Sequence, residues 1–592
     1  MSERSVGYQV TVGDPHQHML DVSVVVRGDA LPEPLVVAMP VWTPGSYLVR
    51  EYARHVEALR ATGDGVAAGV RKLRKDTWAI AHGGAREVTV TYRVYARDLT
   101  VRTCYIDDTL VWINGAAAFI RPVEEGFDWD ALPCELALSV RVPGAVVTAL
   151  DAREEGRWCA RSYHELVDSP IAVGDAELRR FEVAGREHLL AVWGGARAQG
   201  YTAERLERDL ARIVEAEVSF FGGAPYDRYV FFVFLVVGGR GGLEHGRCTA
   251  VMASPDCFEA DESYHDLLSL LAHEFFHLWN VKRIVPAGLA PIDYARENHT
   301  RLLWLFEGAT SYYDWQFLRR AGVVTPAQYL RHLAAEVTAV EETPGRFEQT
   351  LEEASFDAWL KLYRPDEHTL NSTVSYYRKG ELACALLDLE IRVRSDGQRS
   401  LDDVMRHLWR EHGLTGRPVP EQNFEALVAA ATDVDVSDMV DRCIRTTDPL
   451  PYAEGFAHAG LSLRARPGRG ATLGLRLRVE GGRVMVAAVL RGGPGAAAGV
   501  CPGDEIIGFQ GRRVDENALR ERLRRGASLA GREVSLLVAR RDELRTLGVV
   551  PADAPPESHE IFPREGASPG ARKLAECWLT CASSALWNGE TA

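Results

Sequence analysis

The feature that most constrains this chain is an H-E-x-x-H pattern that begins at His273 and ends at His277. Residues four apart share one face of a helix, so the two imidazoles can bind a single metal ion. Glu274 would lie close to such an ion, where it suits the role of general base. Leucine-rich turns precede the pattern and predict a buried helix over 267–280. Buried ionisable side chains need partners, and a metal ion supplies one.

A second apolar helix is predicted over 301–320, and it carries Glu307 among large apolar side chains. A buried carboxylate is costly unless it is paired or bound to a metal. Glu307 is the natural third ligand, which gives a His₂Glu set with an open position, the catalytic type of zinc site. Two alternatives stay open. Glu307 could form an ion pair with an arginine, and the two histidines could simply bond to backbone carbonyls of a core helix. The pattern favours one zinc ion per chain, bound by His273, His277 and Glu307.

Residues 1–175 predict an all-β domain. Apolar and polar residues alternate over 88–94 and again over 136–142, which is the period of half-buried strands. The segment Pro40–Tyr47 is rich in turn-forming and aromatic residues. It predicts either a loop that reaches a neighbouring domain or a packed aromatic corner of the sheet.

Residues 176–450 predict a second, mainly helical domain. Within it, Tyr229–Val237 is a continuous apolar run, as expected of a strand covered on both faces. The run leads into a glycine-rich segment that contains Gly241, Gly242, Leu243 and Glu244. Glycines let a backbone approach another group closely. A buried strand that delivers glycines and a carboxylate favours the edge of a functional site over a mobile surface loop.

Two further segments follow the helical domain. Residues 460–550 predict a compact unit with a glycine-rich turn at 493–499. Residues 551–592 begin with several prolines and predict a C-terminal tail. This tail would end either in a short helix over 574–586, docked by Trp578, or in disorder.

Composition indicates a soluble globular protein, with 46% hydrophobic and 26% charged residues among 592. This length is too great for one core and predicts several domains. No apolar run reaches the ~18 residues of a membrane span. The first fourteen residues lack the features of a secretory signal, which favours the cytoplasm. The ten scattered cysteines read as free thiols, and a net charge of −15 argues against nucleic-acid binding.

Five segments resemble the glycyl aminopeptidase family of zinc metallopeptidases, which belongs to the gluzincins with thermolysin and the alanyl aminopeptidases. They are HELVDSPI (164–171), HEFFHLWNVKRIVP (273–286), ENHTRLLWLFEGATSYYD (297–314), SFDAWLKLYRPDE (355–367) and TVSYYRKGELACALLDLEIR (373–392). The resemblance covers about residues 5 to 550. It implies a multidomain α+β fold: an N-terminal β domain, a thermolysin-like catalytic domain and a PDZ domain at 460–550.

The resemblance implies the zinc ligands and the base already named, and it adds further roles. Tyr377 resembles the tyrosine that donates a hydrogen bond to the oxyanion in related aminopeptidases. The segment Gly241–Glu244 looks like the loop whose carboxylate holds the α-amine of the substrate. His245 departs from the alanyl aminopeptidases, which have Asn there. The turn of Leu473, Gly474 and Leu475 resembles the carboxylate-binding loop of PDZ domains.

These residues predict a zinc-dependent aminopeptidase that acts on peptides with a free N-terminus. Glu274 would take a proton from water and deliver it to the leaving amine, while Glu244 pairs with the substrate amine. The family name implies Gly or Ala at the first position. Two alternatives stay open: a zinc endopeptidase, if Glu244 lies away from the metal, and a PDZ protein that binds peptide C-termini and has a vestigial peptidase fold.

Overall fold

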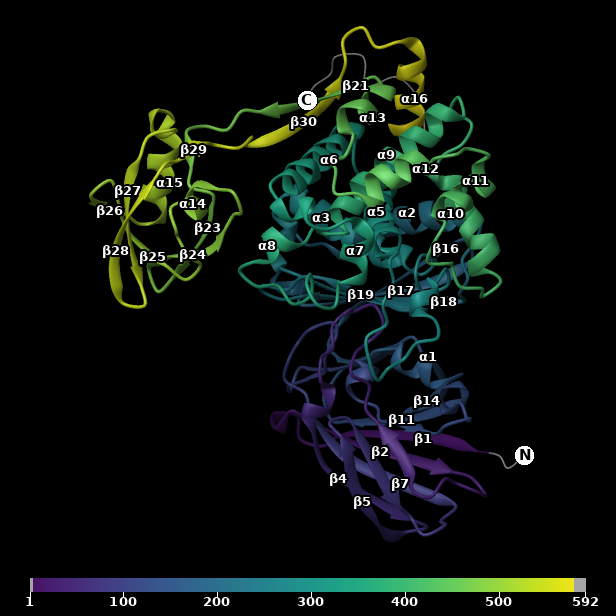
Figure 1. Cartoon of the computed structure of the whole chain (residues 1–592). Helices are drawn as coiled ribbons and strands as arrows, with labels where there is room; N and C mark the ends of the chain where they lie inside the picture. Colours follow the sequence, from purple (N-terminus) through teal and green to yellow (C-terminus); the bar gives the residue numbers. More distant parts are fainter. Residues whose placement is uncertain (1–3, 580–592) are drawn as a thin grey trace. The chain divides into compact units, whose positions relative to one another are not determined.

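The computed structural model of the protein describes residues 4–579 (Figure 1). The chain forms two compact units. Unit one combines Met1–His299 with Trp409–Val419, and unit two combines Thr300–Leu408 with Pro420–Ala592. The cysteines of the described part are free thiols. None of the helices between residues 4 and 579 has the length and apolar character needed to cross a lipid bilayer.

Unit one begins with a large sheet that is antiparallel except where β1 pairs with β11. Its strands, in spatial order, are β10 (Arg121–Val123), β3 (Leu35–Ala38), β6 (Thr77–Ala81), β5 (Val66–Arg74), β4 (Val56–Gly63), β7 (Glu87–Tyr95), β2 (Met19–Arg27), β1 (Ser5–Val12), β11 (Cys134–Val140), β14 (Arg157–Ala160) and β13 (Asp151–Glu154). Every second residue of β2 and of β7 is buried, as the alternating pattern predicts. The predicted N-terminal β domain is confirmed.

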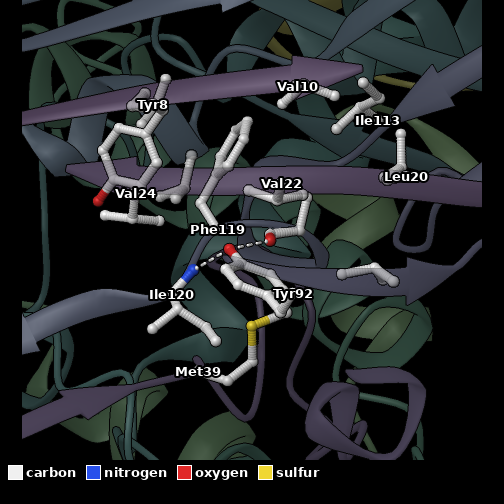
Figure 2. Close-up of a cluster of buried hydrophobic side chains, with 14 of the residues drawn as sticks. Tyr8, Val10, Leu20, Val22, Val24, Met39, Tyr92, Ile113, Phe119 and Ile120 are labelled. Atoms are coloured by element: carbon white, nitrogen blue, oxygen red, sulfur yellow. Dashed lines mark hydrogen bonds between the residues drawn. The ribbon is translucent and has the colours of Figure 1, made fainter. Parts of the chain in front are cut away.

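The core of this region is aliphatic and aromatic, and the hydroxyl of Tyr92 is buried within it (Figure 2). The hydroxyl of Tyr92 donates to the carbonyl of Ala118 at 2.8 Å and accepts from the amide of Ile120 at 2.9 Å. A buried phenol without these partners would be costly. The two bonds therefore fix the segment around 118–120 against the sheet.

Two smaller sheets complete the strands of unit one. The first orders β12 (Ala145–Thr148), β15 (Ile171–Gly174), β9 (Leu110–Ile113) and β8 (Tyr105–Ile106). The second orders β16 (Glu177–Val183), β17 (Arg186–Trp193), β18 (Arg228–Leu235), β20 (Cys248–Ala253) and β19 (Gly242–Glu244). The strand β18 runs parallel to both of its neighbours and is buried along nearly its whole length. It is the apolar strand that the sequence predicts, and β19 forms the edge of the sheet.

Helices cover this second sheet. They are α2 (Ala203–Phe221) and α3 (Asp261–Phe276), and α3 packs against β19 and β20. The helix α2 begins at a Thr202 cap and ends at Gly222, which has a φ of 79°. The edge strand β19 therefore lies directly against the helix that carries the H-E-x-x-H pattern.

Unit two is mainly helical over residues 303–408 and 420–458. Its helices are α4 (Leu303–Phe306), α5 (Gly308–Arg320), α6 (Pro326–Glu341), α7 (Leu351–Phe356), α8 (Thr369–Ser372), α9 (Arg378–Arg394), α10 (Leu401–Leu408), α11 (Phe424–Thr432), α12 (Ser437–Val440) and α13 (Tyr452–His458). The buried helix α9 packs against α5, α6 and α13. This arrangement confirms the predicted helical region.

The single helix predicted over 301–320 is in fact two helices, which meet at Glu307. The backbone of Glu307 has φ −108° and ψ −44°, away from regular helix values. Next to it, a Cβ on Gly308 would lie 2.7 Å from the Cα of Gly380 in α9. The backbones of α5 and α9 therefore touch at the point where the helix breaks.

Unit two also contains a β-rich region, which in the sequence lies between the two strands of a ribbon. The ribbon pairs β21 (Leu461–Arg466) with β30 (Ser558–Pro563). Between them lie the pair β22 (Ala471–Thr472) and β29 (Ala552–Asp553), a sheet, and the helices α14 (Pro494–Ala497) and α15 (Glu516–Arg525). The sheet orders β23 (Leu475–Glu480), β24 (Arg483–Val489), β25 (Glu505–Phe509), β27 (Val534–Arg540) and β28 (Glu543–Val549), with β26 (Arg512–Arg513) on β25. This region has its own apolar core.

After the ribbon the chain returns to the helices through α16 (Pro569–Leu579). The indole nitrogen of Trp578 donates to the hydroxyl of Tyr312 in α5 at 2.9 Å, and that hydroxyl donates to Asp388 at 2.6 Å. The predicted helix over 574–586 thus begins five residues earlier, at residue 569. Its predicted part beyond residue 579 lies outside the described residues.

We expect Trp578→Ala to destabilise unit two by about 3–5 kcal/mol, because it empties a fully buried indole site and removes a hydrogen bond. Thermal unfolding followed by calorimetry measures this change. Cys577→Ser is the matched control, since Cys577 is exposed on the same helix. Equal unfolding temperatures for the Trp578→Ala variant and the wild type would contradict the docking of α16.

Candidate active site

The helix α3 places two imidazoles side by side at its C-terminal end. His273 lies in the last turn, and His277 is the capping residue, with φ −58° and ψ −20°. The ring centroids are 4.6 Å apart, and the rings are nearly perpendicular. Both side chains are buried. The backbone therefore stays helical long enough to present both rings on one face.

The hydrogen bonding of His277 fits a metal ligand. Its Nδ1 lies 2.8 Å from the carbonyl oxygen of Asn280. A carbonyl can only accept, so Nδ1 carries the proton and Nε2 keeps its lone pair. Ligating histidines commonly have this arrangement, because the second nitrogen is held by an outer partner. The two histidines of α3 are thus suited to bind a divalent metal such as zinc.

The edge strand β19 lies against the carboxylate of Glu274. A Cβ on Gly242 would fall 2.2 Å from Oε1 of Glu274, so no larger residue fits at position 242 without displacement. Arg102 donates to the carbonyl of Gly242 at 2.8 Å and holds the strand from the N-terminal β region. The glycine-rich segment therefore permits the close backbone approach that the sequence indicates.

Glu244 ends β19 and is buried, with 3% of its surface exposed. One of its oxygens, one oxygen of Glu274 and one ring nitrogen of His277 lie within 4.8 Å of one another. Oε1 of Glu244 has no hydrogen-bond partner among residues 4–579. Two buried carboxylates this close repel each other when both are charged, and a cation bound beside them would relieve that repulsion. A metal ion or a protonated amine would supply that charge.

Asp168 has a role that the sequence reasoning missed. Its Oδ1 accepts from Nδ1 of His245 at 3.0 Å and from Nζ of Lys282 at 2.7 Å, and its Oδ2 accepts from the amide of Gly246 at 2.7 Å. Burial opposes ionisation, yet the Lys282 ammonium and the His245 bond hold the pKa of Asp168 well below its usual range. Asp168 lies in the HELVDSPI segment, and that resemblance was the only signal in the sequence.

The Pro40–Tyr47 segment also reaches this site. A Cβ on Gly45, whose φ is 89°, would lie 2.4 Å from Oε1 of Glu244. The indole of Trp42 donates to the carbonyl of Asp293 at 2.8 Å, and Trp42 and Tyr47 are fully buried. Both sequence alternatives therefore hold, because the segment is a packed aromatic corner that also extends to Glu244. A cavity of about 310 Å³ lies between these residues.

The remaining predicted residues lie in unit two. Glu307 is 2% exposed, and its amide donates to the carbonyl of Leu303 at 2.7 Å. Tyr377 directly precedes α9 and is half-buried, and its hydroxyl is 2.8 Å from that of Tyr363. The turn formed by Leu473, Gly474 and Leu475 joins β22 to β23, and the amide of Gly474 donates to the side chain of Thr472 at 3.1 Å.

Three family models match the chain. The M61 peptidase N-terminal domain covers residues 7–175, the M61 glycyl aminopeptidase covers 266–383 and a PDZ domain covers 471–550. Among solved structures, an aminopeptidase N family protein from Idiomarina loihiensis matches with a TM-score of 0.90 and 29% identity, over 97% of this chain and 100% of that one. An M1 zinc metallopeptidase from Deinococcus radiodurans matches with a TM-score of 0.48 and 16% identity, over 76% and 96%. No curated protein sequence matches.

The fold, the helix α3 and these matches define a metallopeptidase with a C-terminal PDZ domain. More specifically, its N-terminal and peptidase segments match the models of the M61 glycyl aminopeptidase family, and the chain is an aminopeptidase of that type. The family resemblance and the fold class expected from the sequence are both confirmed.

We expect Gly242→Ala to lower the rate of peptide hydrolysis by about 100-fold or more, because the added methyl group would displace the carboxylate of Glu274. Steady-state kinetics on a small chromogenic substrate measures the loss, and circular dichroism checks the fold. Gly7→Ala is the control, since a Cβ there has nothing within 4 Å. Full activity in the Gly242→Ala variant would contradict the close approach of β19 to Glu274.

Proposed function

We propose that the protein removes single residues from the N-terminus of peptides, with one zinc ion bound by His273, His277 and Glu307. The bond from His277 Nδ1 to a backbone carbonyl supports Nε2 as a ligand. The burial of Glu307 supports a bound cation as its partner. The matched peptidase segment, residues 266–383, contains all three side chains.

The position of Glu244 is the observation that carries this proposal. In a peptide, the α-nitrogen and the first carbonyl carbon are only about 2.5 Å apart. An amine bound to Glu244 would therefore bring the first peptide bond beside Glu274 and His277, whose polar atoms lie within 4.8 Å of a Glu244 oxygen. An endopeptidase would instead need Glu244 to lie away from Glu274. The intact pair of histidines and the base also disfavours a vestigial site.

The proposed reaction is hydrolysis of the first peptide bond. A bound zinc ion supplies a Lewis acid that polarises the carbonyl and makes a water molecule more acidic. Glu274 accepts a proton from the water as the water oxygen bonds to the carbonyl carbon, and it passes that proton to the leaving nitrogen as the C–N bond breaks. Tyr377 donates a hydrogen bond to the oxygen that gains charge, a contribution of about 3 kcal/mol for a well-placed donor. Glu244 holds the amine and so fixes which bond is cleaved.

The finer features are proposals as well. The description of the family supports Gly or Ala at the first position of the substrate. We also propose the domain bounds 1–175, 176–450 and 460–550, with a tail at 551–592. The matched ranges 7–175, 266–383 and 471–550 support them. A cytoplasmic location stays a prediction from the sequence.

We expect the protein to cleave Gly- and Ala-4-nitroanilide but not their N-acetylated forms, because acetylation removes the charge that Glu244 would bind. A chelator should abolish the activity and zinc should restore it. The Glu274→Gln variant should retain zinc by elemental analysis and lose about 10³-fold or more in kcat, since the base is gone.

Each other outcome points to a different function. Cleavage of the acetylated substrates at similar rates would favour an endopeptidase. Unchanged turnover in Glu274→Gln would remove this residue from the reaction. No hydrolysis of any N-terminal residue by the zinc-loaded wild type would favour the PDZ domain as the functional part of the chain.

A second function is supported by the β-rich region of unit two. We propose that its PDZ domain binds the C-terminal segment of a peptide. The strand β23 lies at the edge of its sheet, where an extended peptide can add as a further strand. The turn Leu473–Leu475 directly precedes this edge and would receive the terminal carboxylate.

We expect excision of residues 467–557 to raise KM for peptides of about eight residues and to leave the 4-nitroanilides unchanged. The ribbon makes this deletion feasible, because Arg466 and Ser558 are paired neighbours and a two-residue turn can join them. Asn371 bonds to Val489 and Arg491 of the excised region, so the excision also removes these two contacts. Asn371→Ala is the control, because it removes the same contacts but keeps the region itself. Equal effects on both substrate classes would contradict a tethering role.

A further inference from the structure

We infer that Asp168 is a positioning residue for Glu244, so that the N-terminal β region supplies part of the amine-binding site. This inference rests on the proposed amine-binding role of Glu244. It assigns a task to the HELVDSPI segment and to the loop at Gly45, neither of which belongs to the peptidase segment at 266–383.

Asp168 is held firmly by the N-terminal region. It follows the short helix α1 (Tyr163–Val167), which Ser162 caps through a bond to the amide of Glu165. The hydroxyl of Tyr163 donates to the carbonyl of Phe119 at 2.7 Å inside the β core. The amide of Asp168 donates to the carbonyl of His164 at 3.0 Å. The carboxylate therefore projects from a rigid support.

The carboxylate fixes the backbone that follows Glu244. Its bonds to the side chain of His245 and to the amide of Gly246 engage the two residues immediately after Glu244. The amide of His245 also donates to the carbonyl of Cys248 at 2.9 Å, which closes the turn between β19 and β20. Glu244 is thus held from the turn that follows it, and its own Oε1 has no bonding partner among residues 4–579.

The third partner of Asp168 links this turn to the helix of the histidines. Lys282 comes five residues after His277, and its ammonium lies 2.7 Å from the same Oδ1 that accepts from His245. One ionised carboxylate therefore joins the end of β19 to the segment after α3. Because a charge-assisted bond is short and directional, this junction sets the spacing between Glu244 and the imidazoles.

Gly45 confines the carboxylate of Glu244 from another direction. The contact is so close that a methyl group at position 45 would lie 2.4 Å from Oε1 and 2.5 Å from Oε2. The loop that carries Gly45 is anchored by the bond from the amide of Val41 to the carbonyl of Tyr294 at 2.9 Å. The orientation of Glu244 is therefore set by backbone and packing from the N-terminal region.

A positioning role predicts a particular kinetic signature. Glu244 binds the amine, while Glu274 moves the proton, so displacement of Glu244 should weaken binding more than chemistry. We expect Asp168→Asn to raise KM for Ala-4-nitroanilide about tenfold, the size seen when an outer partner of a functional side chain is lost, with kcat changed by less than about threefold. Zinc content and the unfolding temperature are measured on the same sample.

Position 245 offers a rescue test that also applies if Asp168→Asn does not fold. An Asn at 245 places its Nδ2 close to where the histidine places Nδ1, and Ala places no donor there. We expect His245→Ala to raise KM severalfold and His245→Asn to restore a near-wild-type value. The matched control is Asp151→Asn, because Asp151 is exposed and pairs with Arg247 at 3.0 Å.

The Glu244→Gln variant separates this inference from the proposed function. If Glu244→Gln leaves KM for free-amine substrates unchanged, the amine-binding role itself is wrong. If Glu244→Gln raises KM but Asp168→Asn and His245→Ala do not, only the positioning role fails. If the role is correct, Asp168→Asn has no further effect on KM in the Glu244→Gln background, whereas multiplicative effects would show independent action.

Discussion

The site depends on a buried carboxylate, that of Glu244, whose Oε1 has no hydrogen-bond partner among residues 4–579. Two carboxylates, those of Glu244 and Glu274, share a small buried volume with an imidazole of His277. Such a grouping is unfavourable in the absence of a cation, because two carboxylates this close repel each other when both are charged. The fold must therefore hold these side chains in place against their own electrostatics. That requirement explains why so many rigid backbone contacts converge on β19 and α3.

The support comes from segments that are far apart in the chain. The loop at Gly45, the carboxylate of Asp168 and the guanidinium of Arg102 contact residues at or beside β19, and the ammonium of Lys282 bonds to that Asp168 carboxylate. Each of these contacts uses either a glycine that removes a side chain or a charged group with specific hydrogen bonds. A precise site can be built in this way from distant segments, because each contact fixes a different direction.

Sequence reasoning succeeded where local physics determines the outcome. Alternation predicted β7, the apolar run predicted β18 and the i, i+4 spacing placed His273 and His277 on one face of α3. Sequence reasoning failed where contacts between distant segments determine the local structure or the partners of a side chain. The break at Glu307 lies where α5 approaches Gly380, and the partners of Asp168 are more than seventy positions away. Neither follows from the alternation or the helical spacing of residues in a local window of sequence.

Both ends of the PDZ region are likewise fixed by contacts between segments that are far apart in the chain. The chain leaves the helices through β21 and returns beside it through β30, so both ends of the inserted region are fixed at one place. The chain then continues into α16, whose indole reaches the hydroxyl of Tyr312 and, through it, Asp388. An insertion whose ends are already paired adds little loop-closure cost to the host fold, since that cost grows only slowly with length. The helices that flank Glu307 can therefore keep their packing while the inserted region varies in size or ligand. A chain that simply ended in a PDZ domain would lack this second anchor on α5.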